Sequence, residues 1–181
     1  MLKAAVFSDT HGSTAPMVEA ARGAGADVLI HLGDYDRDAL ALREAFPDTP
    51  LFSVCGNCDI MPLAPEKLVV PLGPVRALLV HGHRYGVSAV QADWLVYAAR
   101  EEGAQLAMFG HTHSPFYETV GGVTLLNPGS AGRSRTPSWA LVTVFDNGAI
   151  ACEIRPIQNP DAGLEGKDYD FRKSWLTDHE S

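Results

Sequence analysis

Seven side chains of the kind that bind divalent metal ions follow apolar stretches at five places in the chain. They are two carboxylates, four imidazoles and one amide: Asp9, His11, Asp34, Asn57, His81, His111 and His113. This mixed set of oxygen and nitrogen ligands suits manganese, nickel, iron, cobalt or zinc better than magnesium or calcium, which prefer oxygen alone. Seven ligands are more than one ion normally takes when substrate also binds, so the set favours two ions that share a carboxylate.

The charge of such a centre predicts a reaction. Two carboxylates and neutral imidazoles supply about two negative charges against about four positive charges from two divalent ions, so the site keeps a positive charge that attracts phosphate. The ions would also lower the pKa of a bridging water towards neutrality and so provide a hydroxide nucleophile. A serine or cysteine nucleophile is then not needed.

Three repeats of strand, loop and helix must position the first of these ligands. We expect strands at residues 3–8, 27–32 and 51–55 and helices at residues 16–24 and 37–46. Successive passes of this kind give parallel strands, buried on both faces, whose carboxyl ends meet at one edge of a sheet. Because ligands bind at that edge, the segments that follow the three strands are expected to lie together.

The second half of the chain predicts short strands and one helix. The expected elements are a hairpin at 67–72 and 75–80, a helix at 88–102, and strands at 106–109, 116–120, 123–126, 140–145 and 150–155. We expect these strands to form mostly a meander, which gives two sheets packed face to face with helices outside. Trp94 and Tyr97 have core spacing on the helix, and packing is their expected role.

Composition predicts one domain at residues 1–157 and a C-terminal extension at 158–181 that packs on the body or on a partner subunit, with a homo-oligomer left open. The chain has 181 residues and is 46% hydrophobic, which is enough for a core. Its 22 acidic against 14 basic residues argue against binding to long nucleic acid or an anionic membrane. Short apolar runs and three cysteines favour a cytoplasmic protein.

Six motifs in order resemble those of the calcineurin-like metallophosphoesterases, most closely their small bacterial and archaeal phosphodiesterase branch. The motifs are Asp-x-His, Gly-Asp, Gly-Asn-x-Asp, His-Gly-His, Gly-His-x-His and Asn-Pro-Gly-Ser, between about residues 6 and 135. The resemblance implies a four-layer α-β-β-α sandwich of two mixed sheets and a phosphodiesterase with two divalent ions, manganese first among the candidates. It also implies the division of ligands: Asp9, His11, Asp34 and His113 for one ion, and Asp34, Asn57, His81 and His111 for the other.

The proton donor to the leaving group is the open question. Many members of the superfamily have a histidine where this chain has Cys58, and a thiol of ordinary pKa is a weak donor to an alkoxide. We therefore expect a preference for diesters with good leaving groups, such as aryl esters. His83 could donate the proton instead, or hold a ligand or the phosphate. Asp59 could orient a ligand histidine or cap a turn.

Other residues and functions remain as alternatives. Arg133 and Arg135 could bind a phosphate oxygen or lie in solvent, and His31 is expected to be a buried, hydrogen-bonded histidine. The substrate is expected to be a small phosphodiester or a nucleotide, with a phosphomonoesterase or nucleotidase as the nearest alternative. The resemblance also allows a protein-interaction scaffold, because a retromer subunit of this fold has lost several ligands. All seven ligand positions are kept in this chain.

Overall fold

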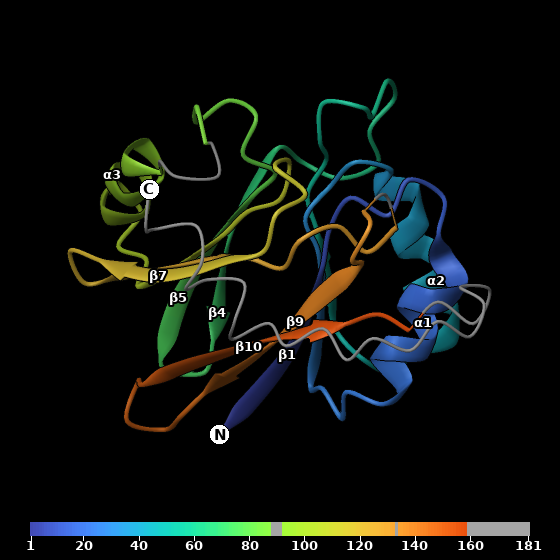
Figure 1. Cartoon of the computed structure of the whole chain (residues 1–181). Coiled ribbons are helices and arrows are strands. Elements are labelled where there is room, and N and C mark those ends of the chain that lie inside the picture. The colour runs from blue at the N-terminus through green and yellow to red at the C-terminus, as the bar shows by residue number, and fades with distance from the viewer. Residues whose placement is uncertain (88–91, 133, 159–181) are drawn as a thin grey trace, which may run out of the picture.

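Two five-stranded sheets pack face to face in the computed structural model, which describes residues 1–87, 92–132 and 134–158 (Figure 1). The first sheet has the order β10-β9-β1-β2-β3, with bounds Ile150–Pro156, Ser138–Val144, Leu2–Phe7, Val28–His31 and Leu51–Ser53. The second has the order β4-β5-β6-β8-β7, with bounds Lys67–Leu72, Val75–Val80, Leu106–Met108, Val123–Asn127 and Phe116–Val120. The helices are α1 (Thr14–Arg22), α2 (Ala39–Ala45) and α3 (Asp93–Glu101), and a short 3-10 turn spans Asp36–Asp38.

Alternation along the strands produces the four layers. In β1, Ala4 and Val6 face the apolar cluster between the two sheets, whereas Ala5 and Phe7 face the cluster against α1 and α2. A third apolar cluster joins the outer face of the second sheet to α3. Helices therefore cover both outer faces, as Figure 1 shows, and the predicted α-β-β-α sandwich is confirmed.

The parallel part of the first sheet aligns three strand ends. β1 pairs with β2 and β2 with β3, both in parallel, and Phe7, His31 and Ser53 are neighbours across the register. The loops that follow these residues therefore leave the sheet at the same edge. This arrangement, expected from the sequence, brings the first ligand segments together.

The expected meander is wrong for much of the second half. β5, β6 and β8 are parallel, because α3 forms a crossover between β5 and β6 and the β7–β8 hairpin folds back so that β8 lies beside β6. β9 returns to the first sheet and pairs antiparallel with β1, and β10 follows it. A strand buried on both faces, such as β1, is typical of the middle of a sheet, but local periodicity does not show which strand will pair with its second edge.

The packing expected for two aromatic residues of α3 is also wrong: Trp94 is 71% exposed and Tyr97 61%. Leu95, Val96 and Ala99 form the buried face of this helix instead. Three predictions fall outside the described residues, namely those for Arg133, for residues 88–91 of the expected helix, and for the C-terminal extension beyond residue 158.

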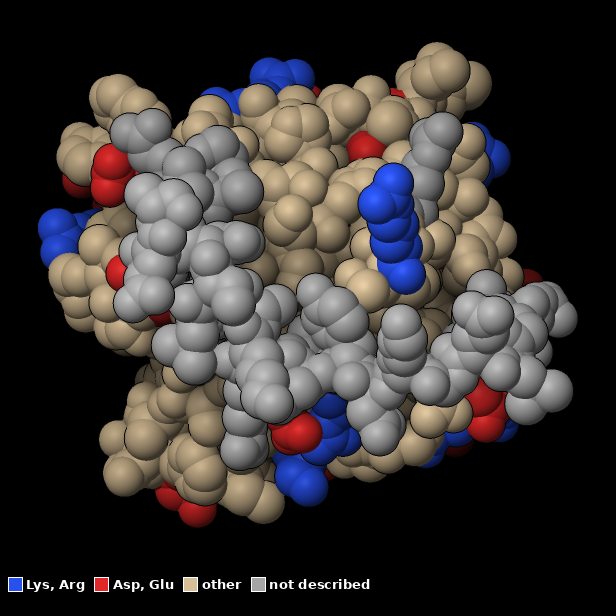
Figure 2. Space-filling view, viewed as in Figure 1, with Lys and Arg blue, Asp and Glu red and all other residues tan. Residues whose placement is uncertain are grey.

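On the face shown in Figure 2, the Lys and Arg side chains form no continuous band. In the part of the chain that the structure describes, no helix is both long enough and apolar enough to cross a membrane.

Candidate metal centre

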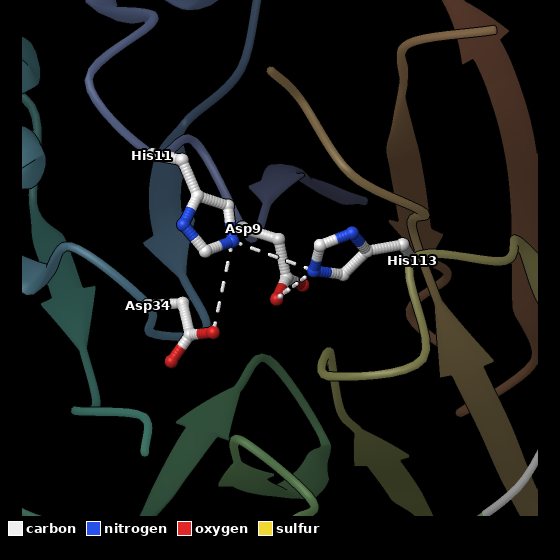
Figure 3. A group of neighbouring side chains, drawn as sticks. All are labelled: Asp9, His11, Asp34 and His113. Carbon is white, nitrogen blue, oxygen red and sulfur yellow. Dashed lines mark hydrogen bonds and ion pairs between the residues drawn. The ribbon is translucent and has the colours of Figure 1, made fainter. Parts of the chain in front are cut away.

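Four of the seven predicted ligands converge at the carboxyl edge of the first sheet. Asp9 and His11 follow β1, Asp34 follows β2, and His113 lies in the loop after β6, and one ligand atom from each lies within 4.8 Å of the others. The Nε2 of His113 is 3.2 Å from Asp9 Oδ1, and the Nε2 of His11 is 3.7 Å from Asp34 Oδ2. Figure 3 shows the four side chains pointing toward one another.

Backbone strain is concentrated at the same place. Among the described non-glycine residues, positive φ occurs at six: Asp9, His11, Asp34, Tyr35, His111 and His113. Five of the six are predicted ligands. Left-handed backbone at such residues costs about 1–3 kcal/mol each and persists where the surroundings hold it, typically at functional sites.

Hydrogen bonds fix the Asp9 carboxylate and leave one of its oxygens without a partner. The Ser8 hydroxyl donates to Oδ2 over 2.6 Å, the His111 N–H donates to the same oxygen over 3.1 Å, and the Ser130 hydroxyl donates to the Asp9 carbonyl over 2.8 Å. The other oxygen, Oδ1, is buried and accepts no hydrogen bond. A buried carboxylate oxygen without a donor is costly unless a cation faces it.

His81 presents a second unpartnered atom. Its Nδ1 donates to the Leu32 carbonyl over 2.7 Å, which places the proton on Nδ1 and leaves the Nε2 lone pair free to bind a metal. This Nε2 is buried, forms no hydrogen bond and lies 3.3 Å from Asp34 Oδ1. Burial lowers the pKa of His81, but the carboxylates of Asp34 and Asp9 outweigh burial and raise it.

Asp34 lies between the two sets of ligands. Burial by itself would raise the pKa of Asp34, but the nearby His81 ring and the Cys58 N–H, which donates to Oδ1 over 2.9 Å, hold that pKa below its usual value. Gly56 makes this approach possible. A Cβ at Gly56 would overlap Asp34 Oδ1 and lie 2.9 Å from His81 Cδ2.

The remaining predicted ligands are less converged. The His111 ring lies 5.3 Å from the His81 ring, while Asn57 is exposed and its amide lies 3.6 Å from Cys58 Sγ. Among the described His, Cys, Asp and Glu residues, Asp34, His81 and His111 do not form a second tight group. The structure therefore brings one predicted ion's ligands together and leaves the other set more open.

The candidate proton donors differ in their surroundings. Burial, followed by the neighbouring Asp34, raises the pKa of the Cys58 thiol to about 11. The His83 ring lies 5.5 Å from that of His81, its Nδ1 is buried without a hydrogen bond, and burial lowers its pKa. Arg135 is exposed.

Two carboxylates fasten the loop that carries Asn57 and Cys58. Asp59 accepts the N–H groups of Gly56 and Asp36 over 2.7 and 2.9 Å, which fits the turn-capping alternative for this residue. Asp36 is buried and accepts the N–H groups of Leu63 and Ala64 over 2.5 and 2.9 Å. The loop is therefore held mainly through its backbone.

His31 is buried and hydrogen-bonded, as expected. Its Nδ1 accepts the Gly33 N–H over 3.3 Å, so its Nε2 donates to the Thr10 hydroxyl over 3.1 Å. Burial lowers the pKa of His31, in keeping with a neutral ring.

Several supporting residues were not identified from the sequence. Asn127 donates to the Gly110 carbonyl over 2.8 Å and so holds the segment that carries His111 and His113. Ser8 and Ser130 hold Asp9 as described above. Asn127 and Ser130 belong to the Asn-Pro-Gly-Ser motif and Ser8 precedes the Asp-x-His motif, but the motifs by themselves do not show these hydrogen bonds.

Tyr35 was also missed, and it lines two pockets beside the ligands. One pocket of about 320 Å³ is lined by Tyr35, Asp36, Arg37, Cys58, Asp59, Ile60 and Met61. The other, of about 360 Å³, is lined by Thr10, His11, Ser13, Tyr35 and Gly132. A Cβ at Gly132 would overlap the Thr10 carbonyl, so the second pocket depends on glycine there.

The residues fit a divalent transition metal. Imidazole and carboxylate ligands suit such ions, and the unpartnered Asp9 Oδ1 and His81 Nε2 are buried atoms that an ion would satisfy. The Leu32 carbonyl and the Ser8 hydroxyl supply the outer hydrogen bonds that orient metal ligands.

Known proteins show similarity over most of the chain. The model of the calcineurin-like phosphoesterase superfamily domain matches residues 2–147. The chain is 30% identical to the probable metallophosphoesterase YsnB of Bacillus subtilis, over 85% of this chain and 95% of that protein. It is 29% identical to the phosphodiesterase YfcE of Escherichia coli K12, over 83% and 91% of the two proteins. Wild-type Vps29 of Entamoeba histolytica, solved with zinc, matches with a TM-score of 0.67 and 24% identity over 87% of this chain and 100% of that one.

Proposed function

Because the chain belongs to the calcineurin-like phosphoesterase superfamily, we propose that it is a phosphodiesterase that uses two divalent metal ions to activate water for attack on phosphorus. The observation that carries this proposal is the convergence of Asp9, His11, Asp34 and His113, together with a buried Asp9 oxygen that accepts no hydrogen bond. When bound, the ions would lower the pKa of water and offset the negative charge of the phosphate.

The ligands divide at Asp34 in this proposal. Asp9, His11 and His113 would hold one ion, Asn57, His81 and His111 would hold the other, and Asp34 would be shared between the two sets. The short distances from Asp34 Oδ2 to His11 and from Asp34 Oδ1 to His81 support a shared carboxylate. Manganese is the first candidate for both ions. The zinc complex of the structurally similar Vps29 makes zinc a second candidate.

A small phosphodiester fits the charges better than a monoester or a long nucleic acid. A monoester carries more negative charge and calls for more cationic contacts. Of the described arginines that follow ligand motifs, Arg37 contacts the Met61 carbonyl, Arg84 pairs with Glu66, and Arg135 is exposed. The scattered basic side chains of Figure 2 and the net charge of −8 argue against a long polyanion. The phosphodiesterase YfcE gives independent support for diesters.

Metal reconstitution tests the proposal. Protein stripped with a chelator would be assayed with Mn, Ni, Co, Zn and Mg on bis(p-nitrophenyl) phosphate and on p-nitrophenyl phosphate. We expect transition metals to restore hydrolysis of the diester more than that of the monoester. Elemental analysis should find about two ions per chain, and about one in Asn57→Ala. A protein that binds no transition metal and shows no metal-dependent activity would contradict the proposal.

A protein-interaction scaffold is the second candidate, favoured by exposed apolar side chains. Trp94 and Tyr97 on α3 and Ile60 and Met61 in the loop after β3 are all more than half exposed. A scaffold of this kind would form a stable complex without metal. If Asp34→Asn abolished metal binding yet left a cellular function of the protein intact, the scaffold would replace the enzyme as the better explanation.

A further inference from the structure

The two pockets that share Tyr35 differ in chemistry. In the first, which we call the apolar pocket, the surface is mostly apolar and comes from Tyr35, Cys58, Ile60 and Met61. The carboxylates of Asp36 and Asp59 also line it, but both accept backbone N–H groups of the surrounding loop. In the second, the polar pocket, the surface is mostly polar.

The two carboxylates of the apolar pocket are therefore engaged with the backbone of the loop. The third charged group, the exposed Arg37 guanidinium, makes one long contact of 3.4 Å with the Met61 carbonyl. Ile60 is 95% exposed, Met61 74% and Tyr35 46%. Exposed apolar side chains that gather beside a reaction centre gain free energy when a ligand covers them.

Each pocket has a lining residue that lies close to Asp34, and the two residues approach different oxygens of it. Cys58, which lines the apolar pocket, donates its N–H to Asp34 Oδ1 over 2.9 Å. His11, which lines the polar pocket, has its Nε2 3.7 Å from Asp34 Oδ2. Tyr35 directly follows Asp34 and lines both pockets. A phosphodiester likewise has two ester groups on one phosphorus, so a phosphate bound at the ligands could extend one group into each pocket.

We propose that the substrate is an unsymmetrical phosphodiester, with an apolar or aromatic ester group in the apolar pocket and a hydroxyl-bearing ester group in the polar pocket. This inference rests on the proposed function and names the substrate class of the same site. Hydrolysis then breaks one phosphorus–oxygen ester bond, forms a bond from phosphorus to the oxygen of water, and releases an alcohol that takes up the proton.

Binding of phosphonates tests the apolar pocket without any bond cleavage. Isothermal titration calorimetry of the metal-loaded protein would compare phenylphosphonate with methylphosphonate, which differ in the apolar group alone. Because burial of the phenyl ring removes more apolar surface from water than burial of a methyl group, phenylphosphonate should bind about tenfold tighter than methylphosphonate or more. Because phosphonates have no leaving group, this preference is independent of any preference that arises from proton donation.

One substitution and one matched control locate the preference. Met61→Ser should remove most of it while the Kd for methylphosphonate stays within about twofold, because Met61 lines the apolar pocket and not the polar one. The control, Leu63→Ser, changes a residue of the same loop that is 59% exposed and does not line the pocket, so the preference should persist.

Kinetics test the polar pocket. Methyl p-nitrophenyl phosphate and 2,3-dihydroxypropyl p-nitrophenyl phosphate share a leaving group and differ in the second ester group. We expect a several-fold lower KM for the dihydroxypropyl ester, and a smaller difference between the two esters in Ser13→Ala. Equal KM values in the wild type would overturn this half of the inference.

The outcomes separate this inference from the proposed function. If the protein with metal binds methylphosphonate and hydrolyses the methyl ester but shows no preference for phenylphosphonate, the apolar pocket has been misassigned and the enzyme stands. If it binds neither phosphonate and hydrolyses no diester, the proposed function itself fails. If Met61→Ser changes the oligomeric state and leaves the phenyl preference intact, the apolar side chains form an interface between copies of the chain, and the inference is overturned.

Discussion

The two sides of the candidate metal centre are held in place by different means. On the side of Asp9, the residue is 0% exposed and its backbone is strained, the Ser8 hydroxyl holds its carboxylate, and the Ser130 hydroxyl holds its backbone carbonyl. On the side of the loop after β3, the carboxylates of Asp36 and Asp59 accept hydrogen bonds from backbone N–H groups, and residues such as Ile60 are almost fully exposed. The first side depends on the identity of each side chain, whereas the second depends mainly on the path of its backbone. Substitutions should therefore weaken metal binding on the first side and, apart from the predicted ligand Asn57, alter substrate preference on the second.

Asp34→Asn gives the most severe test of the buried side. The amide oxygen can still accept the Cys58 N–H, so the loop should stay in place, but the shared negative ligand is lost. We expect diester hydrolysis to fall by about 10³-fold or more, because both ions depend on this carboxylate. Elemental analysis and turnover of bis(p-nitrophenyl) phosphate measure the two effects. A variant that keeps full metal content would break the comparison.

Gly56→Ala tests the close contact between the two sides. The new Cβ would overlap Asp34 Oδ1 and lie 2.6 Å from the Asp34 backbone nitrogen, where no flexible side chain can yield. We expect a loss of about 2–3 kcal/mol in the free energy of unfolding, measured by urea titration, together with weaker metal binding. The control is Gly23→Ala, because that glycine has φ of −79° and its nearest non-local atom lies 3.8 Å from the added Cβ. Equal stabilities would show that the loop can move away from Asp34.

Ser8→Ala removes one hydrogen bond from the buried side and keeps every ligand. The Ser8 hydroxyl lies 2.6 Å from Asp9 Oδ2, and without it the carboxylate is less firmly oriented. We expect metal affinity to fall about tenfold, which competition with a chelating dye would measure. Leu63→Ser on the exposed loop provides the contrast, since its metal affinity should be unchanged. If both variants bind metal as the wild type does, the hydrogen bonds around Asp9 have no part in metal binding.

How far the sequence alone predicts this molecule depends on whether a feature is local. The three parallel strands were predictable to within two residues at their C-terminal ends, because an apolar run followed by small and polar residues is a local signal, and their alignment follows from parallel pairing. The pairing of β9 with β1 was not, since it joins residues more than 130 positions apart. Trp94 has core spacing, yet Leu95, Val96 and Ala99 are the residues that pack, because the helix can turn either face to the sheet.

The candidate site shows the same division. The convergence of Asp9, His11, Asp34 and His113 was predictable from residue types and order, but Ser8 and Asn127 act through hydrogen bonds whose partners only the fold brings near. The two pockets at Tyr35 are likewise products of the fold. Residues 35, 58 and 60 lie on two loops that the carboxylate of Asp59 joins, and no local pattern predicts that joint.

Substitution of Cys58 should have the smallest effect, and its direction tests the role of the exposed loop. Because the pKa of the thiol is raised to about 11, it stays protonated at neutral pH and is poorly matched to donate a proton there. Cys58→Ser should therefore change turnover by no more than about twofold. Cys58→His introduces an imidazole with an unperturbed pKa of about 6.5, and it should raise the turnover of alkyl diesters several-fold. Aryl diesters should gain little, since their leaving groups depart without a proton, so the ratio of alkyl to aryl turnover is the quantity to measure. If Cys58→Ser instead lowers alkyl turnover about tenfold or more, the thiol is the proton donor, and the loop carries catalysis as well as substrate preference.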